Sequence, residues 1–287
     1  MRWKTLAVIA LAVSACSTTP PETSVTTTSI QATTTTTVPS DEICKIGDLK
    51  FGDEGLVAAL GEDVGDATTV SNIRWEGSAT CERITIGFAS ASGAPAKTLG
   101  PTGVSVLGYA AVVRVALPAE VSDTAVADML ADGDLVDRAF VVRDDDGAMW
   151  VDIHAPDGPA IAARAFLTTS PSSIVVDITS LESGSRTVGA ATSQTAIVMT
   201  PPAGPTIYPF TVEGYAAPGE LATRVQLVSD GEITTDISDS LPGWTDSWQG
   251  FVVAISDGPS GTVQIFVGSG DVQLDPEGGA FVVVDLP

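Results

Sequence analysis

Hydrophobic and polar residues alternate with a period of two along much of the chain. Such alternation predicts β-strands with one buried face. The dipeptide Asp146-Gly147 separates two of these stretches and is typical of a tight hairpin turn. In the first half of the chain, the predicted strands cover residues 83–88, 112–117, 140–143, 148–153 and 174–178.

The strand pattern stops over residues 181–194, which are rich in Ser, Gly, Ala and Thr and are interpreted as an interdomain linker. It then resumes at 195–199, 210–214, 223–228, 251–255, 262–267 and 281–284. Short strands with turn signals about every ten residues favour β-sandwiches. We therefore expect a mainly β protein with two β-sandwich domains, residues 41–180 and 195–287.

Two short helices are also predicted. The first covers Glu54–Leu60, with Asp53 as its N-cap and Gly61 as its stop. The second covers Thr124–Leu130, behind Ser122 or Asp123 as the N-cap.

The chain begins with the pattern of a secretory signal peptide. Arg2 and Lys4 precede an apolar stretch, Leu6–Val13, which is too short to span a bilayer. Val13-Ser14-Ala15-Cys16 resembles the lipobox of bacterial lipoproteins. The resemblance implies that residues 1–15 are removed and that lipid on Cys16 anchors the protein to the outer face of the cell membrane. The alternative is ordinary secretion with an incidental cysteine.

Residues 16–40 are expected to form a disordered stalk. Of the 24 residues after Cys16, 15 are Ser or Thr and three are Pro, and Glu22 carries the only charge. Such a segment buries too little apolar surface to offset the entropy of folding.

The charge balance excludes one class of partner. The formal net charge is −23, with 36 acidic residues against 13 Lys and Arg. Nucleic-acid binding requires clustered basic residues, so nucleic acid is not expected as a partner. Anionic lipid headgroups are disfavoured for the same reason, which leaves the lipid on Cys16 as the predicted membrane attachment.

Cysteine usage agrees with export. Beyond Cys16, the chain has only Cys44 and Cys81, an even pair that predicts a disulfide in an oxidising compartment. Two cysteines and the distant His154 do not make a tetrahedral zinc site.

Two stretches resemble known domain families. Residues 81–179 resemble the AMIN-like domain of actinobacterial exported proteins, through Cys81–Phe88, Ala111–Leu117 and the Ser-Pro turn and apolar strand that Asp177 closes. Related AMIN domains are β-sandwiches that direct proteins to peptidoglycan, so the resemblance implies a role at the cell wall.

Residues 196–287 resemble the immunoglobulin-like domain of bacterial spore germination proteins. Pro209, Val212, Gly214 and Ala216 fit its first strand, and Trp248-Gln-Gly-Phe251 fits a later one. No germination partner domain accompanies it in this chain, and it is interpreted as a surface module.

The sequence offers little catalytic chemistry. His154 is the only histidine and is interpreted as a surface residue at a strand end. Asp144-Asp145-Asp146 lacks the spaced ligands and distal Glu of a calcium loop. No glycine-rich phosphate loop follows a strand, and among the abundant acids no carboxylate pair stands out. We therefore expect no catalytic residues, no cofactor and no metal.

Trp244 and Trp248 leave two interpretations open. Aromatic residues on an exposed loop act as surface binding residues, for example by stacking on sugars. Alternatively, Trp248 fills the core and Trp244 packs over an edge, which is the favoured reading.

Two functions follow as hypotheses. The first is a non-catalytic cell-envelope lipoprotein whose β-sandwich modules contact peptidoglycan or another wall component. The second is a protein-interaction scaffold for other exported proteins, with no affinity for wall polymer.

Overall fold

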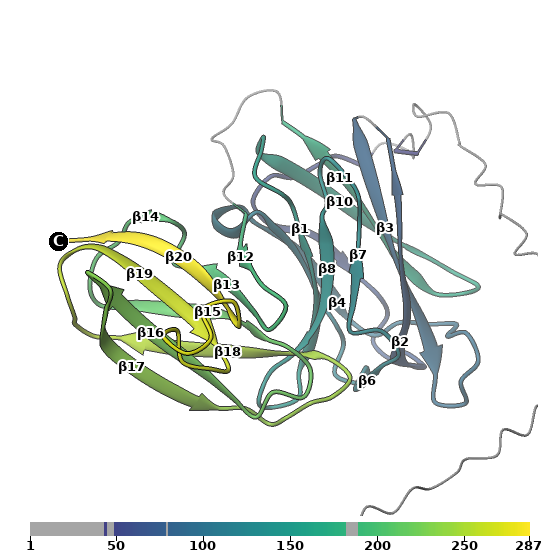
Figure 1. The fold of residues 1–287 in the computed structure, drawn as a ribbon. Helices are drawn as coiled ribbons and strands as arrows, with labels where there is room; N and C mark the ends of the chain where they lie inside the picture. The colour runs from purple at the N-terminus through teal and green to yellow at the C-terminus, as the bar shows by residue number, and fades with distance from the viewer. Residues whose placement is uncertain (1–42, 45–48, 79, 182–188) are drawn as a thin grey trace, which may run out of the picture. The chain divides into compact units, whose positions relative to one another are not determined.

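The computed structural model describes residues 43–44, 49–78, 80–181 and 189–287. The predicted signal peptide, Cys16, the stalk and half of the predicted linker (182–188) lie outside the described residues. The described part is nearly all β, as the sequence predicts, and its strands form sheets packed as sandwiches (Figure 1). Within this part, no helix is long and apolar enough to cross a membrane.

The first sandwich has one complete sheet and one half of a longer sheet. The complete sheet has the order β10 (Ile161–Thr168), β11 (Ser173–Ser180), β3 (Cys81–Ser90), β2 (Ala67–Gly77) and β6 (Asp123–Thr124). The half sheet has the order β1 (Gly55–Leu60), β4 (Thr102–Leu107), β5 (Val112–Ala116), β9 (Met149–His154) and β8 (Arg138–Arg143), with β7 (Asp128–Leu130) beside β8.

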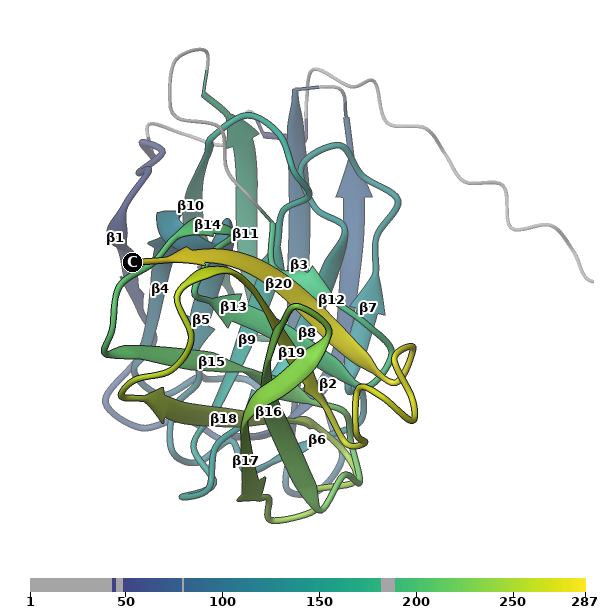
Figure 2. The same ribbon diagram turned by 60° about the vertical axis from the view of Figure 1, so that its left-hand side comes forward.

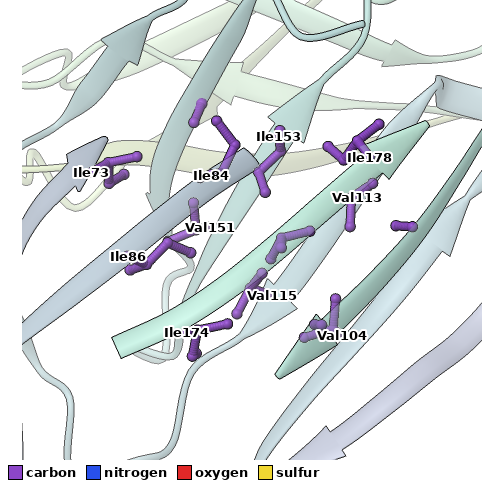
Figure 3. Packing of buried hydrophobic residues seen from close by; sticks show 14 of the residues in the cluster. Ile73, Ile84, Ile86, Val104, Val113, Val115, Val151, Ile153, Ile174 and Ile178 are labelled. Carbon is purple, nitrogen blue, oxygen red and sulfur yellow. The ribbon is translucent and has the colours of Figure 1, made fainter. Parts of the chain in front are cut away.

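Alternate side chains of these strands fill the first hydrophobic core. Ile84 and Ile86 of β3 and Ile174 of β11 point inward from one sheet, and Val113 of β5 and Val151 of β9 point inward from the other (Figure 3). The period of two places every second residue of a strand on one face, so the next residue faces the opposite way. The first core is therefore the direct product of the alternation in the sequence.

The second sandwich completes the longer sheet and adds another. The longer sheet continues from β8 into β18 (Trp248–Ile255), β15 (Phe210–Ala216), β13 (Ala196–Thr200) and β12 (Ala191–Thr192). The outer sheet has the order β14 (Gly204–Pro205), β20 (Gly279–Leu286), β19 (Gly261–Gly268), β16 (Ala222–Ser229) and β17 (Glu232–Ser240). Figure 2 shows the strands of these two layers, and residues from both form the second hydrophobic core.

Both predicted helices are wrong. The segment 54–60 forms β1, which pairs antiparallel with β4, and residues 123–130 form β6 and β7. β6 lies beside β2 and β7 lies beside β8, so one short segment supplies an edge strand to each sheet. Isolated helices of about seven residues are marginal in water, and pairing with an existing sheet edge satisfies more backbone groups.

The predicted hairpin is confirmed. Strands β8 and β9 pair antiparallel up to Arg143 and Met149, and Gly147 has a φ of 85°. The Asp144 carboxylate accepts a hydrogen bond from the Ala148 N–H at 2.8 Å, which closes the turn. The glycine is required here because side chains disfavour this left-handed conformation.

A buried row of charges crosses the outer face of the complete sheet. Asp177 of β11 is fully buried and lies opposite Arg83 of β3 and Arg164 of β10. Arg83 Nε donates to Asp177 at 2.6 Å and Arg164 Nη2 at 3.0 Å. The carboxylate thus ties together three neighbouring strands.

The start of the described chain lies against this row. Arg164 donates to the main-chain carbonyls of Leu49, at 3.1 Å, and Cys44, and its guanidinium stacks on Phe51. Cys44 and Cys81 lie at disulfide distance and are paired, with their Cα atoms 6.3 Å apart. The disulfide therefore attaches Cys44 to the first residue of β3.

Replacing the buried carboxylate should destabilise the fold severely. We expect Asp177→Ala to lower the free energy of unfolding by about 3–5 kcal/mol, because two guanidinium groups lose their common partner. Chemical denaturation of the full chain measures the change.

The exposed Arg224–Asp236 pair provides the control. Asp236→Ala should have a far smaller effect, because water already solvates both charges. Equal losses in the two variants would contradict the role assigned to Asp177.

Candidate functional site

The two sandwiches meet through the strand faces that the two main cores leave free. In β5, β8 and β9 the inward residues alternate with residues that face β13, β15 and β18 of the second sandwich. Together with the facing residues of the second sandwich, these outward residues form a third apolar cluster, the joint core: Ala110, Val112, Phe140, Val142, Ile197, Met199, Tyr215 and Trp248. The strands β8, β9 and β13 are therefore buried on both faces along most of their length.

Aromatic rings occupy the centre of the joint core. Phe140 lies edge-on to Trp248, with ring centroids 4.9 Å apart, and edge-on to His154, also at 4.9 Å. Tyr215 lies 6.1 Å from Phe140 and 6.0 Å from His154. Such edge-to-face pairs stabilise packing beyond the area they bury.

Asp152 is the polar centre of the joint. Its carboxylate is fully buried and accepts two hydrogen bonds from Arg114, at 2.9 and 2.7 Å. The Trp150 indole N–H donates to it at 3.1 Å, and the Tyr215 hydroxyl donates from the second sandwich. Asp152 therefore joins β5, β9 and β15 through one carboxylate.

The ionisation states around Asp152 follow from burial. Burial and the Asp152 charge raise the pKa of Tyr215 well above its usual value, so the phenol keeps its proton and donates. Burial opposes the charge of Arg114, but the hydrogen bonds and charge of Asp152 raise the pKa of Arg114 overall. The joint thus holds a stable carboxylate–guanidinium pair.

A second set of polar contacts joins the sandwiches at the start of β18. Arg143 of β8 donates to Asp246 at 2.9 Å and stacks over the Trp244 ring at 4.5 Å. The Trp248 indole N–H donates to Asp128 at 2.9 Å. Nearby, β8 and β18 pair in parallel, with Trp248 opposite Val142.

An acidic groove of about 350 Å³ opens beside the joint core. Trp150, Tyr215 and Arg114 contribute to its lining, and the edge of the Trp150 ring packs on Gly250, where a Cβ would lie 3.1 Å from the ring. Its carboxylates come from both sandwiches: Asp144, Asp145, Asp146, Glu213 and Asp239. The groove thus combines aromatic rings, one guanidinium and several acceptors.

The structure places the tryptophans singled out by sequence in different surroundings. Trp248 is 2% exposed and fills the joint core, so its ring is not available as a surface binding residue. Trp244 is half-buried beneath Arg143. Neither lines the acidic groove; among the tryptophans that the structure describes, Trp150 does.

The interpretation of His154 as a surface residue is wrong. It ends β9 but is 2% exposed, because the second sandwich covers this end of the strand. Burial lowers the pKa of His154 to about 4; the charge of Asp152 opposes this shift, and those of Arg114 and Arg138 add to it. The imidazole is therefore neutral at neutral pH.

Sequence reasoning missed Asp152, Arg114 and Tyr215. The available signal was a charged residue on the polar phase of two predicted strands, Arg114 within 112–117 and Asp152 within 150–153. In the described residues, no group of three or more His, Cys, Asp or Glu side chains is arranged to hold a metal ion. The arrangement of Asp152, Arg114 and Tyr215 is suited to hydrogen bonding and stacking.

Comparison with known proteins names no family for this chain. No protein-family model matches it, and the search of curated proteins finds no significant match. The two domain resemblances remain predictions.

Protonation of His154 at acid pH should lower the free energy of unfolding. Its pKa is about 4 in the folded protein and 6.5 in the reference state, so between these values the unfolded chain binds more protons. Stability should therefore fall as pH drops from about 6.5 to 4, by up to about 3 kcal/mol from this residue.

Urea unfolding at several pH values tests this expectation. His154→Leu should flatten the acid limb relative to wild type, while the carboxylates contribute equally to both proteins. Parallel stability curves for the two proteins would contradict it.

Proposed function

We propose that this protein is a non-catalytic cell-envelope lipoprotein that contacts peptidoglycan or another wall component through the acidic groove. Lipid on Cys16 would hold it to the outer face of the membrane, and residues 16–40 would space the sandwiches from the bilayer. The groove is the observation that carries the proposal. It is the described cavity in which aromatic rings, a guanidinium and several carboxylates converge.

The chemistry of the groove supports a polymer rich in hydroxyl, amide and amino groups. Carboxylates such as Asp145 and Glu213 accept hydrogen bonds from all three groups. An aromatic wall such as Trp150 packs on the apolar face of a sugar ring. A net charge of −23 disfavours polyanions.

Preorganisation also supports binding. Asp152 holds Arg114 and Trp150 through hydrogen bonds, and Arg114 stacks on the Trp150 ring at 4.9 Å. A ligand entering the groove therefore loses little free energy to the ordering of these side chains.

Catalysis forms no part of the proposal. A hydrolytic nucleophile requires an adjacent base, and the only histidine is buried in the joint with a pKa near 4. The same residue contacts aromatic rings on two sides.

The anchor has a direct chemical test. Mass spectrometry of protein purified from the envelope should find an N-terminus at Cys16 carrying a diacylglyceryl thioether. Cys16→Ala should abolish lipid labelling of the chain. A free thiol at Cys16, or cleavage at another position, would contradict the lipoprotein assignment.

Wall binding is tested by sedimentation of the detergent-solubilised full chain with purified, protein-free cell wall. Asp145→Asn/Glu213→Gln removes two groove carboxylates and should reduce retention about tenfold, the effect expected from losing charge-assisted hydrogen bonds. Asp63→Asn/Glu62→Gln makes the same charge change at exposed positions away from the groove and should bind as wild type.

Two results would count against this function. Retention no higher than that of albumin would exclude wall binding, and equal losses in both double variants would exclude the groove. Binding only to wall that retains its proteins would support the scaffold function instead.

A further inference from the structure

A second cavity, of about 580 Å³, lies between the sandwiches and shares only Met199 with the acidic groove. We call it the histidine chamber. Its lining is mostly apolar and comes from Asp137 just before β8, from the end of β9, from β12 and β13 with their flanking residues, and from β20.

His154 lines this chamber with its hydrogen-bonding capacity unused. The residue is 2% exposed, and neither ring nitrogen has a hydrogen-bond partner among the described residues. A neutral imidazole offers one N–H donor and one lone-pair acceptor. Leaving both ring nitrogens unpaired in a buried position costs free energy. A ligand that forms a hydrogen bond with the imidazole would therefore gain binding free energy here.

Asp137 presents a second unpaired group to the same chamber. Its Oδ1 is buried and has no hydrogen-bond partner in the described part of the chain. The Asp137 main-chain N–H donates to the His154 carbonyl at 3.0 Å, which places the two residues side by side. Desolvation raises the pKa of Asp137 above its usual value, although neighbouring backbone N–H groups and the charge of Arg138 act in the opposite direction.

The charged residues that line the histidine chamber indicate the charge of a ligand that would bind there. Asp137 and Asp157 are its ionisable acids, and the described lining includes no Lys or Arg. The nearby Arg138 is paired with Asp128 at 3.1 Å and stacks over Phe140. An anion would therefore be repelled, whereas an ammonium group would neutralise Asp137.

We propose that the histidine chamber binds a small amine with an apolar body. Its ammonium group donates to the Asp137 carboxylate and to the unprotonated nitrogen of His154. The apolar body packs against Pro201, Val198 and Phe281. An α-amino amide with an apolar side chain supplies both the ammonium group and the apolar body. This site is separate from the acidic groove and does not depend on wall binding.

The single histidine makes the test specific. The full chain, in detergent and with a histidine-free tag, is labelled with ¹⁵N-histidine and titrated with L-leucinamide. We expect saturable shifts of the His154 imidazole nitrogens. N-acetyl-leucinamide keeps the body and the carbonyl but has no ammonium, and it should bind at least about tenfold more weakly.

Matched variants assign the ammonium contact. Asp137→Asn should weaken L-leucinamide at least about tenfold, while the His154 signal continues to report a folded joint. Asp134→Asn, at an exposed position outside the chamber, should bind as wild type.

Three results would overturn the proposal. The first is the absence of any imidazole shift with L-leucinamide, including the case in which the amine binds only in the acidic groove. The second is an equal response to the acetylated probe. The third is unchanged affinity in Asp137→Asn.

Discussion

The buried carboxylate of Asp152 is the interaction on which the joint between the sandwiches depends. A buried charge is stable only when its hydrogen bonds are satisfied, and Asp152 takes its partners from both sandwiches. Because Tyr215 of β15 is one of these partners, the requirement holds β15 against β5 and β9. It also orients Arg114 and Trp150 in the acidic groove and keeps the second sandwich over His154. The Asp152 carboxylate thus positions side chains that line both the acidic groove and the histidine chamber.

The alternation in the sequence predicts the two main cores but not the joint. Val113 and Val115 flank Arg114, and Val151 and Ile153 flank Asp152, so the alternation identifies the buried strand faces directly. Alternation does not say what covers the other face, so Asp152 and His154 read as exposed positions. Their burial depends on contacts with Tyr215, more than 60 residues away in the chain, which no local pattern reports. The helices predicted at 54–60 and 124–130 failed for a related reason, because available sheet edges outweighed local helix propensity.

The two cavities differ in chemistry although they flank the same core. The acidic groove displays carboxylates and aromatic rings in a preorganised arrangement and is suited to an extended polar ligand. The histidine chamber is walled by apolar residues around two unpaired polar groups and is suited to a small ligand. Met199 lines both cavities, so a change in the packing of this side chain would alter the shape of both.

The parallel pairing of β8 with β18 has a further consequence for how molecules of this protein meet one another. Open sheet edges present unpaired backbone groups that recruit strands from other molecules. At the joint, the ladder runs from β9 through β8 into β18 and β15, and β7 covers the remaining part of β8. Each sandwich thereby covers part of an edge strand of the other, at Val142 and Arg143 of β8 and at Trp248 and Gln249 of β18, and these backbone groups are not open to a strand from another molecule.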